Sequence, residues 1–151
     1  MTDGAKGGSE APHLDLSFTW RYSHALGELS PFFTGLQAEK AMATSCRVCR
    51  NAWFPPRLAC PVHGLTTAWI ELAGGGTIRA ATRSTLSLPL TGRTEDVWLV
   101  LVAMDGANNL VTGRMAAGSQ VDRGMRVRLA VDTGRTVHPI QALIFRPAST
   151  G

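Results

Sequence analysis

Cysteine is scarce in this chain, with only three residues among 151. All three lie between positions 46 and 60, and an odd number of closely spaced thiols cannot build the disulfide framework of a small secreted domain. Crowded cysteines outside such a framework are more typical of a metal site. Their spacing therefore carries most of the chemical information in the sequence.

Long apolar runs are missing as well. No stretch approaches the roughly 18 consecutive apolar residues that a membrane-spanning helix requires. The opening segment MTDGAKGGSEAPHLD is polar and lacks the apolar core of a secretory signal, so we expect a protein of the cytoplasm with no membrane association. A content of 44% hydrophobic and 17% charged residues is typical of a folded chain, either one domain or a small module joined to one compact domain.

Acidic residues are too few to balance the basic ones, and the net charge is +4 at pH 7. Thirteen of the fifteen basic residues are arginine, and they are scattered rather than gathered in a run. This pattern suits nucleic acid, an anionic cofactor or an acidic protein, and it suits a solvated surface equally well. Charge alone does not choose among these partners.

Aromatic residues gather near the start of the chain. We expect residues 1–13 to form a disordered tail, and residues 14–44 to form an aromatic arm followed by a short helix. Phe18, Trp20 and Tyr22 alternate, so an extended arm would place them on one side. Such an arm is too aromatic to stay free in water. We expect it to pack on its own core or on a partner.

The helix is predicted to begin at SPFF. Ser30 would cap the first amides, and Pro31 fits the first helical position. Phe32, Phe33 and Leu36 would then share one face. For the two phenylalanines, burial in the chain's own core and contact with a partner remain equally open.

From residue 68 the pattern changes to short strands separated by turns. Residues 97–104 are apolar on both faces, as in a central strand, and residues 125–132 alternate as in a half-buried strand. Gly74–Gly76 interrupt an apolar run where a bend or bulge forms most easily. Five short strands within residues 68–148 predict a mainly β fold with a five-stranded OB-fold barrel, and a small sandwich is the alternative.

The three cysteines and one histidine form two evenly spaced pairs. Cys46 and Cys49 are separated by two residues, as are Cys60 and His63, and ten residues lie between the pairs. Two such pairs on facing turns can bring four ligands into a tetrahedron around Zn²⁺. We therefore predict a zinc ribbon over residues 45–67, with structural Zn²⁺ held by these four residues.

Three other interpretations of this segment remain open. A catalytic zinc ion needs an open coordination position, whereas all four positions are used here. A rubredoxin-type iron site, which would make the chain a redox carrier, normally uses four thiolates, so His63 argues against it. The segment could also hold its fold by packing alone, with His63 free of metal.

The order of these segments resembles the DUF35 family of acyl-CoA-associated proteins, which have a rubredoxin-like zinc ribbon followed by an OB-fold. The matching stretches are FFTGLQAEK before the ribbon, CRVCRNAWFPPRLACPVH within it, GGGTI at the start of the barrel and GMRVRL near its end. The resemblance spans residues 18–147. In that family the ribbon typically has four cysteines, and His63 stands here in place of the fourth.

The resemblance implies a non-catalytic subunit that supports C–C bond formation or cleavage by a thiolase-like enzyme acting on acyl-CoA thioesters. The implied partner is that catalytic subunit, in a hetero-oligomer. Relatives accompany thiolases, hydroxymethylglutaryl-CoA synthases, phloroglucinol acyltransferases and steroid side-chain aldolases or hydratases, and the small subunit of benzoylsuccinyl-CoA thiolase is similar in layout. Contacts to the phosphates of CoA would come from arginines on outward-facing strand positions, namely Arg79, Arg83, Arg126 and Arg128.

The residues themselves point away from catalysis within this chain. Acyl transfer through a thioester needs a free activated cysteine, and all three are assigned to the ribbon. His24 and His138 have no nucleophile or carboxylate at a diagnostic spacing, and His13 lies in the predicted tail. We expect no catalytic residue in this chain.

The main alternative is a single-stranded nucleic-acid-binding OB module with a zinc ribbon. Such a barrel needs aromatic side chains on which bases can stack beside a basic groove. Beyond Trp69 only Trp98 and Phe145 are aromatic. This scarcity ranks nucleic acid second among the expected partners.

Overall fold

The computed structural model describes residues 14–20, 22–87, 94–116, 118–131 and 143–148. The tail predicted for residues 1–13 lies outside these ranges, as do His13 and His138. Within the described ranges, no helix is long and apolar enough to cross a membrane.

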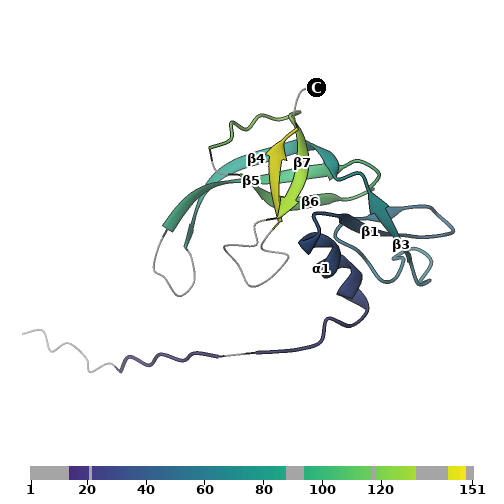
Figure 1. The fold of residues 1–151 in the computed structure, drawn as a ribbon, viewed down its shortest axis with the longest axis horizontal. Coiled ribbons are helices and arrows are strands. Elements are labelled where there is room, and N and C mark those ends of the chain that lie inside the picture. The colour runs from purple at the N-terminus through teal and green to yellow at the C-terminus, as the bar shows by residue number, and fades with distance from the viewer. Residues whose placement is uncertain (1–13, 21, 88–93, 117, 132–142, 149–151) are drawn as a thin grey trace, which may run out of the picture.

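A short helical segment and a small sheet come first along the chain (Figure 1). A 3-10 turn, η1 (Gly27–Leu29), leads into the helix α1 (Ser30–Gln37). Three strands follow, β1 (Ala41–Ser45), β2 (Ala52–Trp53) and β3 (Ala68–Leu72). They form an antiparallel sheet in the order β2-β1-β3, and α1 packs against β1.

The five remaining strands close into a barrel, which confirms the predicted architecture. They are β4 (Gly75–Ser87), β5 (Thr94–Met104), β6 (Leu110–Met115), β7 (Arg126–Val131) and β8 (Leu143–Pro147). Their order around the barrel is β4-β5-β6-β8-β7, and β4 closes it by pairing with both β5 and β7. Only the pairing of β6 with β8 is parallel among the described strands. β5 pairs on both sides, as its apolar sequence predicted.

The strand β3 belongs to the small sheet and not to the barrel. All five residues of β3 pair with β1, from Ala68 opposite Ser45 to Leu72 opposite Ala41. The barrel begins only at Gly75. An apolar strand fits either sheet by its pattern, and the register that it adopts depends on residues 23 to 31 positions earlier in the chain.

One local prediction was wrong in detail. Ser30 does not cap α1, because η1 already leads into the helix, and its hydroxyl instead donates to the carbonyl of Gly27 at 2.6 Å.

The chain bends at Gly74, where φ is 79°, as the sequence predicted, and a further irregularity in β4 lies between Ile78 and Ala80. The next glycine also permits a close approach, since a Cβ on Gly75 would lie 2.8 Å from a carboxylate oxygen of Asp105.

One continuous core joins the helix, the ribbon and the barrel. Phe32 of α1 and Phe54, which follows β2, contact each other edge to face with ring centroids 5.8 Å apart. Both belong to the same buried cluster as Val102 and Phe145 of the barrel. Phe32 and Phe33 are 1% and 7% exposed, so they pack within the chain and offer no surface to a partner.

Two asparagines in the turn between β5 and β6 connect the barrel to the ribbon backbone. The side-chain carbonyl of Asn108 accepts a hydrogen bond from the backbone amide of Ala52 at 2.8 Å, and the backbone amide of Asn108 donates to the carbonyl of Ala52. Asn109 does the same with its side chain alone, accepting from the Phe54 amide at 3.0 Å and donating to the Phe54 carbonyl at 2.9 Å. We call these four hydrogen bonds the asparagine clamp. It sets β2 and Phe54 against the barrel.

Asn109→Ala is expected to lower the free energy of unfolding by about 1–3 kcal/mol, because it leaves both polar groups of the buried Phe54 backbone without their partner. Gln120→Ala, at an exposed position, is the control and should change stability by less than about 0.5 kcal/mol. Denaturant unfolding of both variants measures the difference. Equal stability of the two variants would show that the clamp does not hold the ribbon.

Candidate metal centre

Two turns with the same hydrogen-bond pattern present the predicted ligands. Each turn begins with a cysteine, Cys46 or Cys60. The backbone amide of this cysteine donates to the carbonyl five residues later, and the amide four residues later donates to the carbonyl of the cysteine. The four bonds are Cys46 N to Asn51 O, Arg50 N to Cys46 O, Cys60 N to Leu65 O, and Gly64 N to Cys60 O, at 2.8–2.9 Å. The repeated pattern makes the two turns structurally equivalent halves of one site.

The equivalent residues Arg50 and Gly64 share an unusual backbone conformation. Their φ angles are 58° and 64°, in the left-handed region. Glycine adopts this region freely, whereas an arginine pays a steric cost there. The turn geometry therefore imposes this conformation regardless of the residue that occupies it.

The two turns bring Cys46, Cys49, Cys60 and His63 together, and we call this set the ribbon site. Their ligand atoms all lie within 4.8 Å of one another. The distances between ligand atoms are 3.8 Å from Cys49 Sγ to Cys60 Sγ, 3.5 Å from Cys60 Sγ to His63 Nδ1, and 3.7 Å from Cys46 Sγ to His63 Nδ1. Bonds of about 2.3 Å to sulfur and 2.0 Å to nitrogen give a zinc tetrahedron with edges of about 3.5–3.8 Å. The donor set and its spacing therefore fit a tetrahedral metal ion.

The site is buried on its sulfur side. Cys46 and Cys60 are buried, Cys49 is half-buried, and Trp53 packs against them in a small core of its own. The imidazole of His63 covers the outer side and is exposed to solvent. Four protein ligands leave a tetrahedral ion no position for water or substrate, which suits a structural rather than a catalytic role.

Hydrogen bonds within the site favour the thiolate form of Cys46 and Cys60. At Cys49 the amide of Asn51 acts to lower the pKa, but burial and the side chains of Cys46 and Cys60 outweigh it and raise this pKa. Burial acts to raise the pKa of Cys60, but the amides of His63 and Val62 and the imidazole of His63 outweigh it and lower this pKa to about 6. An amide hydrogen bond from Cys49 similarly lowers the pKa of Cys46. The hydrogen bonds of His63 to Cys60 and Cys46 raise the pKa of the imidazole. A metal ion binds thiolate sulfur and neutral imidazole nitrogen, so metal binding releases the protons that these four groups carry.

Comparison with solved structures places this architecture among known proteins. A protein of unknown function from the DUF35 family of Sulfolobus solfataricus superposes with a TM-score of 0.57 and 14% identity, over 81% of this chain and 87% of that one. The Ltp2-ChsH2(DUF35) aldolase superposes with a TM-score of 0.63 and 19% identity, over 85% of this chain and all of that one. This chain has the DUF35 fold. No family model and no curated protein matches the sequence.

The resemblance predicted from the sequence is thus confirmed for the fold, because both structures carry the DUF35 designation. The structure brings the four predicted ligands together in the ribbon site, and their binding of a metal ion stays a prediction. A closer likeness to the small subunit of benzoylsuccinyl-CoA thiolase stays a prediction. The comparison supports the architecture and leaves the substrate open.

The four arginines predicted to meet CoA are all exposed, but they are not equivalent on the DUF35 barrel. Arg126 donates to both carboxylate oxygens of Asp105 and to the hydroxyl of Thr77, and these contacts hold its guanidinium in place. Its hydrogen bonds lower the pKa of Asp105. Arg83 lies over the ring of Trp98, 5.8 Å from its centroid, at the other end of β4.

Arg128 has a neighbour that the sequence analysis missed. It lies directly opposite Arg146 in the antiparallel pairing of β7 with β8, so both exposed side chains share the outer face. The sequence signal for this is the alternation of apolar and basic residues at the start of β7, which β8 does not repeat. Neither the pairing of these strands nor their register could be deduced from that pattern. Arg79 is exposed at the irregularity in β4.

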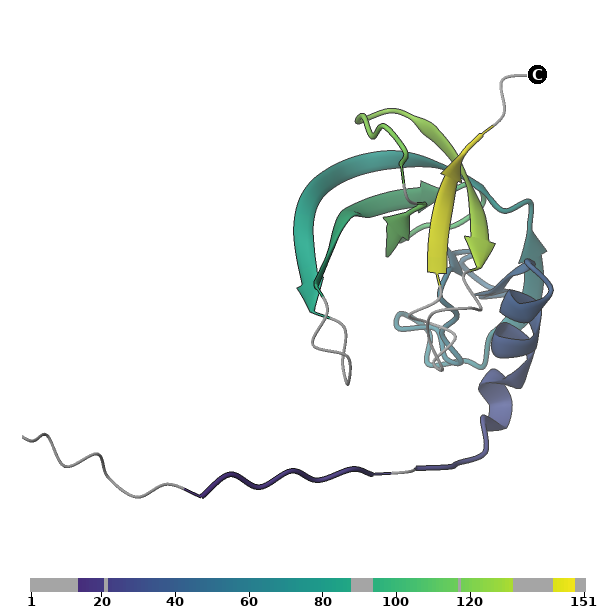
Figure 2. The ribbon, with the colours of Figure 1, turned by 60° about the vertical axis from the view of Figure 1, so that its left-hand side comes forward.

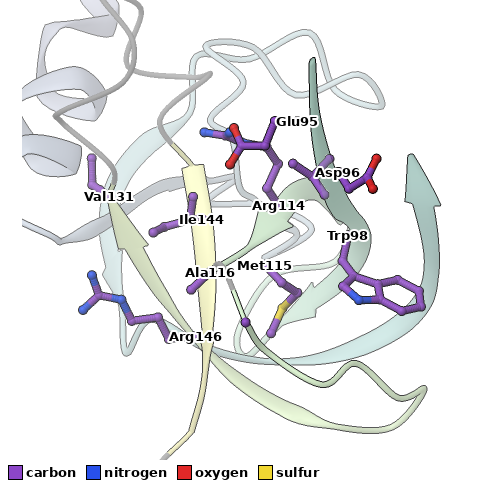
Figure 3. Close-up of a pocket in the computed structure, with 11 residues that line it drawn as sticks. Glu95, Asp96, Trp98, Arg114, Met115, Ala116, Val131, Ile144 and Arg146 are labelled. Carbon is purple, nitrogen blue, oxygen red and sulfur yellow. The ribbon is translucent and has the colours of Figure 1, made fainter. Parts of the chain in front are cut away.

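A cavity of about 350 Å³ lies beside the barrel where β5, β6 and β8 meet (Figure 3). Its apolar lining includes Trp98, Met115, Val131 and Ile144, and its charged lining includes Glu95, Asp96, Arg114 and Arg146. Trp98 is therefore a half-buried wall of this cavity rather than an interior core residue. Both signs of charge line the cavity.

Cys46→Ser is expected to abolish stoichiometric metal binding, because a lost thiolate opens the site. His63→Cys is the matched variant and should keep the ion, since four thiolates form an equally suitable tetrahedron. Metal content after loading with Zn²⁺, together with thermal unfolding, distinguishes the two. Full metal content in Cys46→Ser would show that the Cys46 thiol is not a metal ligand.

Gly64→Ala is expected to lower the free energy of unfolding by about 1 kcal/mol, a purely conformational cost. The added Cβ would meet no atom within 4 Å, so no clash contributes. Arg50→Gly at the equivalent position should instead leave stability unchanged or raise it by up to about 1 kcal/mol. Unfolding of the zinc-loaded variants measures both, and equal losses would contradict the equivalence of the two turns.

Proposed function

We propose that this chain is a non-catalytic accessory subunit of a thiolase-like enzyme acting on acyl-CoA thioesters. The observation that carries the proposal is the convergence of all three cysteines on the ribbon site. Thioester acyl transfer of this kind uses a cysteine nucleophile, and this chain has none to spare. The reacting groups must then come from another protein.

We propose Zn²⁺ as the ion of the ribbon site. The ion would supply a structural link between residues 46–49 and residues 60–63, held by three thiolates and the imidazole of His63. The other residues of the ribbon act on its shape. Thr44 is fully buried, donating to the Arg57 carbonyl at 2.8 Å and accepting from the Arg57 amide at 2.9 Å. These bonds fix the loop between the two turns to β1.

The case for a partner has two supports. One of the similar structures is the Ltp2-ChsH2(DUF35) aldolase, in which a DUF35 component is named together with a second component. The second support is the N-terminal segment of this chain, which exposes large apolar side chains that the described core does not cover. Exposed apolar surface of this kind marks a site of protein association.

Contact with the phosphates of CoA is proposed for the exposed arginines. Arg79, Arg126 and Arg128 lie on the barrel strands β4 and β7. The ion pair with Asp105 fixes the guanidinium of Arg126 and uses only part of its N–H donors, so the others could bind a phosphate. Arg83 lies instead beside Trp98, where an arginine and an indole could receive a planar group. The partner's own surface would complete the site in either place.

Nucleic acid is the less favoured partner. On the barrel, the aromatic side chain that could stack a base is Trp98, and it lines a cavity whose wall also includes Glu95 and Asp96. Carboxylates in that wall oppose a polyanionic backbone. Salt-dependent binding to a labelled single strand would reverse this ranking.

Affinity purification of the tagged full chain from its native cells tests the proposed function. We expect recovery of a thiolase-like protein in stoichiometric amount, with about one zinc ion per chain. The identity of that partner would also narrow the acyl-CoA substrate. Recovery of the chain alone, or with nucleic acid, would overturn the proposal.

Deletion of residues 1–26 is expected to weaken association with the partner by at least about tenfold while the unfolding midpoint stays within a few degrees. The described residues of this segment are exposed, so their removal takes little from the core. Binding titration and thermal unfolding of the same preparation provide the comparison. An unchanged affinity for the partner would show that this segment is not part of the interface.

A further inference from the structure

The segment of residues 14–22, which we call the arm, carries a strict apolar alternation. Its sequence LDLSFTWRY places an apolar residue at every second position over nine residues. The exposed fractions of these side chains range from 66% to 87%, in Leu14, Leu16, Phe18, Trp20 and Tyr22. The structure describes all of the arm except position 21.

The arm is extended and lies apart from the rest of the molecule. Figure 2 shows it below the barrel, joined to the helical end of the chain and separate from both the barrel and the small sheet. Its described residues belong to no sheet. An extended segment of nine residues spans about 30 Å, and its alternating side chains point to opposite faces. One face of the arm is therefore an apolar row, while the polar Asp15, Ser17 and Thr19 lie on the other.

This pattern is that of a half-buried β-strand without its sheet. Alternation of apolar and polar residues arises where one face of a strand packs on a core and the other meets water. The arm pairs with no edge of its own chain within the described residues. The small sheet ends in β3, with five residues, and β2, with two, and in the barrel the part of β4 beyond Ile78 pairs with β5 on one side only. A second copy of the chain would offer these same edges.

We propose that the arm adds as a β-strand to an exposed sheet edge of the catalytic partner, with its apolar row against that partner's core. The inference rests on the proposed function for the existence of this partner. In strand addition, main-chain hydrogen bonds supply affinity, and pockets for alternate side chains supply specificity. The five apolar side chains would fill such pockets, and Asp15, Ser17 and Thr19 would face water.

Register distinguishes strand addition from other ways of binding. A shift of one residue moves every following side chain of a strand to the opposite face, and a shift of two restores the original face. In a helix, neither insertion would restore the face, because successive residues rotate by about 100°. A loosely attached segment would tolerate both. Insertions of one and two residues therefore separate these three arrangements.

The test uses three full-length tagged chains: the unaltered chain, one with a serine inserted after Thr19, and one with serine and threonine inserted there. Each replaces the native chain in its own cells, and the co-purified catalytic subunit is quantified. The single insertion is expected to lower recovery of the partner by at least about tenfold, and the double insertion to restore it to within about threefold. Thermal unfolding serves as the folding control, since the insertion point lies outside the core.

Each outcome decides between the two proposals. Equal recovery of a thiolase-like subunit by all three chains, or loss with both insertions, would overturn strand addition and leave the proposed function standing. The expected pattern with a protein of another class would uphold strand addition as the binding mode and overturn the proposed function. Recovery of no partner by the unaltered chain, or of a second copy only, would overturn both.

Discussion

The asparagine clamp joins two sheets whose described strands do not pair with each other. The side chains of Asn108 and Asn109 and the backbone amide of Asn108 come from a turn of the barrel, and they bind the backbone of Ala52 and Phe54 at the edge of the ribbon. Held there, Phe54 enters the same core as Phe32 and Phe145. The clamp and this shared core explain why ribbon, helix and barrel form one structure.

The ribbon site is connected to the clamp through β2. β2 leads from the first turn of the site directly to the clamped residues, and Trp53 of that strand packs against Cys46 and Cys60. The small core at the site is separate from the large core, so the ribbon packs around the ribbon site at one end and on the barrel at the other. This arrangement suits an ion that shapes a surface rather than one that transforms a substrate.

The fold also divides the chain's apolar residues between internal and external roles. Phe32 and Phe33 are buried in the core, whereas Phe18 and Trp20 of the arm are exposed to solvent. Arg126 is engaged by Asp105, whereas Arg128 and Arg146 face outward side by side. What remains exposed is an extended apolar segment and a basic barrel face, which are the surfaces that the proposed complex would use.

Local spacing in the sequence determined the ribbon site, the strands of the barrel and the alternation of the arm. These features depend on neighbours within a few residues, where the periods of strand and turn act directly. The tertiary structure decided the rest: that β3 joins β1, that Arg128 meets Arg146, and that Asn108 and Asn109 bind the ribbon. Each of these pairs residues distant in the chain. Many partners satisfy the same local pattern, and only packing of the whole core selects one register among them.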